Sequence, residues 1–146
     1  TVRAAFARYT TGNLTLNSNV WANMPSIGTV AVAAAVGDIL EASINLRLGN
    51  ENVALSFDVV SDVSASPVNS FGSGAAAPGQ AAGWVAIAAQ AVNVVGSVMY
   101  TVQSGDISSG NVTCRFRYFG ASATNRTAAA SSTSGIHFSV KNLGPA

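Results

Sequence analysis

The chain has 146 residues, of which 49% are hydrophobic and only 9% are charged, with a formal net charge of +1. An average soluble domain is about 25% charged, so the composition predicts that part of the apolar surface is covered by another copy of the chain. A near-neutral charge without a cluster of Lys and Arg argues against DNA or RNA as a partner.

The first half of the chain predicts β-strands. Short apolar runs at 14–16, 20–22 and 30–32 precede the longest pattern, residues 38–48, in which every second residue from Leu40 to Leu48 is apolar. A period of two is typical of a strand with one buried face. Gly49 and Asn50 form a turn signal before a second alternating run at 53–59, so we expect these two runs to form one long antiparallel hairpin.

Residues 64–83 differ from the strands because they are rich in Gly, Pro, Ala and Ser. Long loops concentrate variation and recognition, so this segment is a candidate for ligand contacts. Further β runs are expected at 84–91 and 97–103. The uncharged stretch 81–102 is also long enough for a membrane helix, but Gln90, Asn93, Gly96 and several valines favour strands, so we expect no membrane insertion.

The last third repeats the strand pattern. A turn at 104–106 and a loop at 108–111 lead into an alternating run at 112–118, and residues 136–140 alternate again. Residues 121–135 predict a loop or, in part, a strand of small side chains. Many short strands without a capped helical pattern indicate an all-β class, either a sandwich or a closed barrel. The long strands and unequal loops favour an antiparallel jelly-roll β-sandwich.

The residues offer little for catalysis. His137 is the only histidine and Cys114 the only cysteine, so neither a catalytic triad nor a His/Cys metal site can be assembled. Asp58 and Asp62 would lie about 13 Å apart on one strand, too far for the carboxylates of a retaining glycosidase. We therefore expect no enzyme activity, no metal and no cofactor, and we expect Cys114 to be an inert apolar side chain.

Two arginines and two tryptophans remain as candidate binding residues. Arg115 and Arg117 lie two residues apart on one predicted strand face, where they could pair with Glu41 or Asp58 across strands, contact a neighbouring subunit, or receive an acidic sugar. Trp84, like Trp21, could stack on a sugar ring, although a tryptophan near a strand end more often packs in the core.

Several short motifs together resemble the C-terminal receptor-binding or tip domains of bacteriophage minor tail and fibre proteins. They lie at Ala5–Thr10, Trp21–Pro25, Ala35–Glu41, Pro67–Phe71, Gly105–Gly110 and Val140–Pro145. Such domains are similar to the trimeric jelly rolls of the tumour necrosis factor and C1q type. The resemblance implies a homotrimer that would also cover apolar residues such as Val60 and Phe119.

The resemblance carries over no fixed binding residues. Within the long loop that is the candidate for recognition, the Pro67–Phe71 motif contributes Asn69 and Phe71 to the predicted binding set, beside Trp84, Arg115 and Arg117.

The expected function is a non-enzymatic, trimeric module at a phage tail tip or fibre that contacts a host-surface receptor such as a glycan. A freestanding oligomeric lectin and a capsid-type assembly jelly roll are the alternatives. The expected location is the virion or the extracellular space. We expect residues 1–146 to form a single domain. The chain starts at Thr1 without a methionine, which is typical of a processed product or of a domain excised from a longer chain, such as its C-terminal part.

Overall fold

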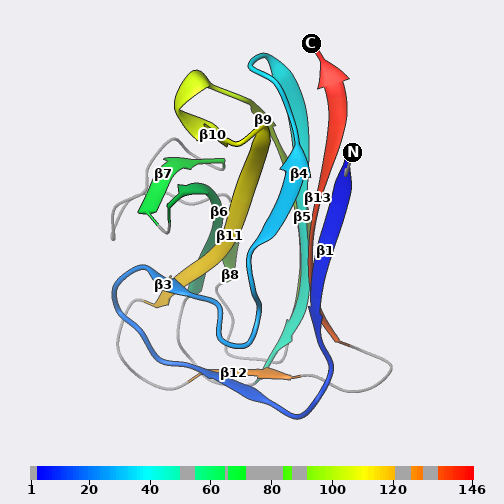
Figure 1. Cartoon of the computed structure of the whole chain (residues 1–146). Helices are drawn as coiled ribbons and strands as arrows, with labels where there is room; N and C mark the ends of the chain where they lie inside the picture. The colour runs from blue at the N-terminus through cyan, green and yellow to red at the C-terminus, as the bar shows by residue number, and fades with distance from the viewer. Residues whose placement is uncertain are drawn as a thin grey trace.

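The computed structural model describes residues 3–49, 55–64, 66–71, 84–86, 92–120, 126–129 and 135–146. These residues form two curved antiparallel sheets, which Figure 1 shows as separate layers. Sheet A contains β1 (Ala4–Tyr9), β13 (Ile136–Pro145), β5 (Asp38–Leu48), β9 (Val92–Thr101), β12 (Arg126–Ala129) and β2 (Leu14–Leu16). Sheet B contains β3 (Ala22–Asn23), β4 (Val30–Ala33), β11 (Asn111–Gly120), β6 (Leu55–Val63), β7 (Ser66–Ser70), β8 (Trp84–Ala86) and β10 (Ile107–Ser108). The predicted all-β class is confirmed, and the layers are those of a β-sandwich.

Four long strands define sheet A in the order β1-β13-β5-β9, while β12 pairs with the last residues of β5 and carries β2 on its other side. In sheet B, β11 lies between β6 on one side and β3 and β4 on the other, and β7 and β8 pair with the far side of β6. Successive strands cross between the sheets: β4, β6 and β11 belong to sheet B, and β5, β9 and β13 to sheet A.

The predicted hairpin between residues 38–48 and 53–59 is wrong. β5 pairs with β13 and β9, whereas β6 pairs with β11 in the opposite sheet. Both strands alternate because each buries one face against the same core. Period-two alternation defines which face is buried, but it does not define the neighbouring strand.

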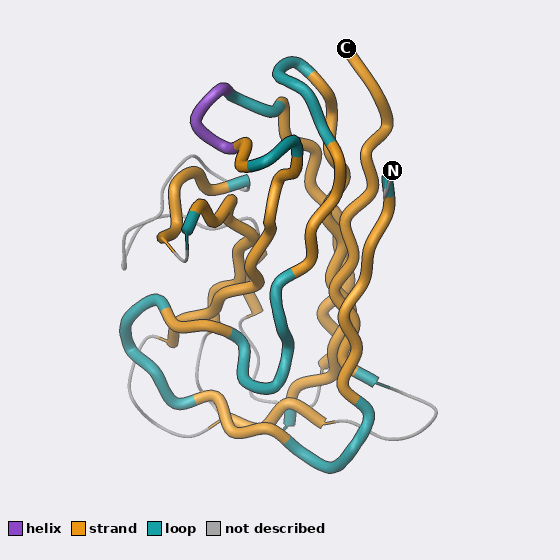
Figure 2. The backbone as a smooth tube through the Cα atoms, in the orientation of Figure 1, coloured by secondary structure: helices purple, strands orange, loops and turns teal. Residues whose placement is uncertain are grey.

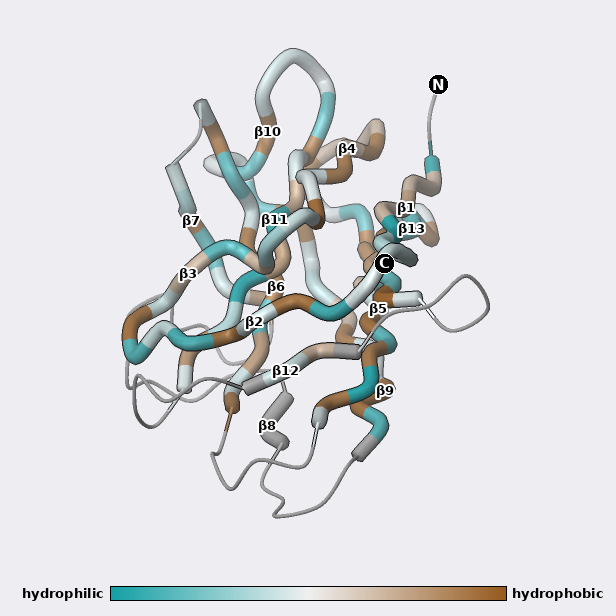
Figure 3. The backbone as a smooth tube through the Cα atoms, turned by 90° about the horizontal axis from the view of Figure 1, so that it is seen from below, coloured by the Kyte–Doolittle hydropathy of each residue, from teal (hydrophilic) through white to brown (hydrophobic). Residues whose placement is uncertain are grey.

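The core fills the space between the two sheets. The ring of Phe116 on β11 lies 5.8 Å from that of Phe57 on β6 and 5.6 Å from that of Phe138 on β13, so it links both layers. Five alternate β5 side chains from Leu40 to Leu48 are at most 2% exposed. Figure 3 shows β2 and β12 crossing one end of the sandwich, where Leu14 and Leu16 are buried.

Two other elements differ from the sequence-based expectations, because β1 was not predicted as a strand and β7 lies within the predicted loop 64–83. β12 agrees with the strand that residues 121–135 allowed in part. The chain is mostly strand where it is described, and Figure 2 shows the 3-10 turn η1 (Ser104–Asp106) as its one helical segment there.

Candidate functional site

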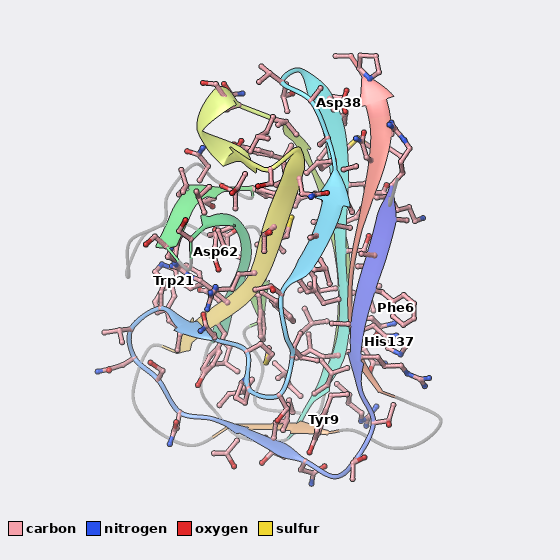
Figure 4. The ribbon with its side chains drawn as sticks, in the orientation of Figure 1. Phe6, Tyr9, Trp21, Asp38, Asp62 and His137 are labelled. Carbon is pink, nitrogen blue, oxygen red and sulfur yellow. The ribbon has the colours of Figure 1, made fainter. Side chains whose placement is uncertain are left out.

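The face of sheet A that points away from sheet B carries most of the exposed apolar side chains. Of the seven large hydrophobic side chains exposed among the described residues, four lie on β1, β9 and β13: Phe6, Val95, Met99 and Leu143. Phe6 is 75% exposed, although its neighbours Ala5 and Ala7 pack against the core. Figure 4 shows the Phe6 ring and His137 directed away from sheet B.

A shallow hollow of about 450 Å³ opens on the same face. Its floor has short side chains, because Ser43, Ser97 and Ser139 are cross-strand neighbours on β5, β9 and β13. Phe6 continues this row on β1, since it pairs with Ser139. The full lining is Ser43, Ile44, Asn45, Val95, Gly96, Ser97, His137 and Ser139.

The rows on either side of the serine row carry the charges. One row runs from Ala4 through Lys141 and Glu41 to Met99, and the Lys141 Nζ lies 3.8 Å from the Glu41 Oε1. The other row runs from Arg8 through His137 and Asn45 to Val95. The lining of the hollow therefore contains no Asp, Glu, Lys or Arg side chain.

Sequence reasoning missed this surface. Phe6 stood in a run that was not predicted as a strand, and the three serines of the row lie far apart in the sequence. The available signal was the order Ala5, Phe6, Ala7, in which the largest apolar residue alternates with small ones that face the core.

A buried carboxylate connects η1 to both sheets. The Asp106 Oδ1 accepts hydrogen bonds from Ser61 Oγ at 2.6 Å and Asn69 Nδ2 at 2.7 Å. Its Oδ2 accepts bonds from Tyr100 OH and the Gln103 backbone N–H, both at 2.7 Å. Burial raises the pKa of Asp106, but the hydrogen bonds together outweigh burial and leave this pKa below its usual value.

This network contains two predicted binding residues. Asn69 is half-buried, and its side-chain amide donates a hydrogen bond to Asp106. Phe71 is 4% exposed and stacks on Tyr100 with ring centroids 4.2 Å apart. Both side chains support the fold at this position, and their role in binding remains a prediction.

The two predicted arginines lie over sheet B among acidic residues. Arg115 Nε donates to Asp62 Oδ2 at 2.7 Å, and its Nη2 donates to the same oxygen. Arg117 is the cross-strand neighbour of Asp58, and both are buried. Burial lowers the pKa of Arg117, an effect that the Asp58 carboxylate opposes. Asp58 and Asp62 are therefore buried beside arginines within the fold.

Aromatic rings cover part of this arginine pair. Trp21 lies edge-on to Phe119 with ring centroids 4.5 Å apart, and the Arg117 guanidinium lies 5.0 Å from the Trp21 ring centre. Phe119 is half-buried and Val60 is fully buried within one chain. The expectation that Val60 needs a second subunit to cover it is therefore wrong, whereas the side chain of Phe119 remains partly exposed.

The remaining candidates offer no assembled chemistry. The backbone of Trp84 belongs to β8, and its side chain lies outside the described residues. Cys114 is buried, and burial raises the pKa of its thiol. The described residues hold no group of three His, Cys, Asp or Glu side chains suited to a metal ion. Within the same part of the chain, no helix has the length and apolar character that a membrane crossing requires.

No protein-family model matches this chain, and no curated protein matches it either. Among solved structures, it is similar at 12% identity to a chain in the structure of the Gx strain of infectious bursal disease virus. The TM-score is 0.20, and the alignment covers 96% of this chain and 40% of the viral one.

Proposed function

We propose that this chain is a non-catalytic module of a virion, a homotrimeric tail-tip or fibre domain that adheres to a host-surface glycan. The outer face of sheet A carries this proposal. It exposes Phe6, Val95 and Met99 to water around a hollow, while the core behind it is already complete. Exposed apolar side chains gathered on one face are typical of a surface that another chain covers.

The composition supports self-association as well. A chain with only 9% charged residues keeps few charges to hold copies apart. The serine row of the outer face of sheet A holds no charged residue. Arg8, Lys141 and Glu41 lie in the rows on either side of it, and Arg47 lies one row further along β5. Depletion of charged residues at the centre is typical of a subunit interface.

The strand order supports the jelly-roll form of the sandwich. A jelly roll has eight strands in two sheets, with Greek-key connections that cross between them. Here β1-β13-β5-β9 face a second layer in which β4, β11 and β6 are neighbours and β8 follows β6. Trimers of similar domains, and the motif resemblance to tail and fibre tips, are the grounds for three-fold symmetry and a virion location.

Sedimentation velocity at micromolar concentration tests the oligomer. We expect a mass near 44 kDa, about three times the 14.7 kDa of one chain. Phe6→Glu should release monomers, because truncating or charging a central aromatic residue of an interface costs about 2 kcal/mol or more. Val36→Glu is the matched control, because Val36 is 61% exposed in the turn before β5. A monomeric wild-type chain would refute the proposal.

A glycan array with the wild-type trimer tests adhesion. We expect signal for a subset of glycans and loss of that signal in Trp84→Ala, provided that sedimentation shows this variant still trimeric. Glycan binding by a monomer would favour a freestanding lectin. Large closed particles without glycan binding would favour a capsid-type role.

A further inference from the structure

We draw no further inference here: the strongest candidate, the serine-floored hollow beside Phe6 on the outer face of sheet A, carries none because nothing in the structure shows what covers it.

Discussion

Removing the Asp106 carboxylate should be among the most destabilising single polar changes in this protein. Asp106→Ala leaves the donors of Ser61, Asn69, Tyr100 and the Gln103 backbone without their acceptor. An unsatisfied buried donor costs about 1–3 kcal/mol. Only the bond from Ser61 is fully buried, and the other three are partly accessible to water. We therefore expect a loss of about 3 kcal/mol, a large share of the ~5–15 kcal/mol stability of a typical domain.

Asp106→Asn should separate the effect of the carboxylate charge on stability from the effect of the side-chain shape, because asparagine has nearly the same shape and no charge. Burial raises the pKa of Asp106, but its hydrogen bonds outweigh this effect and lower it. The folded pKa then lies below the unfolded value of about 3.9, so the stabilisation is complete above about pH 4 and is lost as the pH falls through the folded pKa. The asparagine variant should lose less stability than wild type on acidification. A residual loss should come from Asp38, whose pKa is lowered by its hydrogen bond from Asn142.

Urea unfolding at a series of pH values, followed by tryptophan fluorescence, measures both effects. Ser104→Ala is the control, because it removes the hydroxyl of an exposed side chain in the same turn and leaves the donors to Asp106 in place. It should change the free energy of unfolding by less than about 0.5 kcal/mol. An Asp106→Ala variant within about 1 kcal/mol of wild type, with an unchanged pH profile, would refute the role given to this network.

Two further predictions concern buried groups. Arg115→Ala should lower the free energy of unfolding by about 2–3 kcal/mol, because it leaves Asp62 buried without its partner. Adding Asp62→Asn should recover part of this loss. If the effects of the two changes in urea unfolding were fully additive, this pairing would be contradicted. Cys114 should not react with an aromatic disulfide reagent in the folded protein and should react fully in denaturant; rapid reaction under native conditions would show that the thiol is not buried.

The alternating residues predicted single strands well but predicted their neighbours poorly. The buried face of β5, from Leu40 to Leu48, follows directly from the sequence. Its pairing with β13 and β9 does not, because those partners are distant in the chain and any alternating run satisfies the same pattern. β1 was not predicted as a strand because its outward residue Phe6 is more apolar than the alanines that face the core, which is the reverse of the usual strand pattern.

The candidate site was predictable only in its broad type. Low charge and excess apolar residues predicted a self-associating surface, but of the two residues chosen to explain it, Val60 is buried within one chain and Phe119 is half-buried there. Asp58 was a candidate partner for both arginines, but only strand register shows that it lies beside Arg117 and that Arg115 binds Asp62 instead. The serine row forms only when three strands that are distant in the sequence pair in this register, so no local sequence motif predicts it.

The partners of β5 also determine when sheet A can form during folding. β9 begins about 44 residues after β5 ends, and β13 begins later still. Pairings so far apart in sequence make folding slow, because long loops must close before their contacts form. During synthesis, the alternating β5 strand therefore leaves the ribosome long before either neighbour is available. For that interval its leucine face and its unpaired edge are open to other nascent chains, which makes β5 the segment that a chaperone would most need to shield.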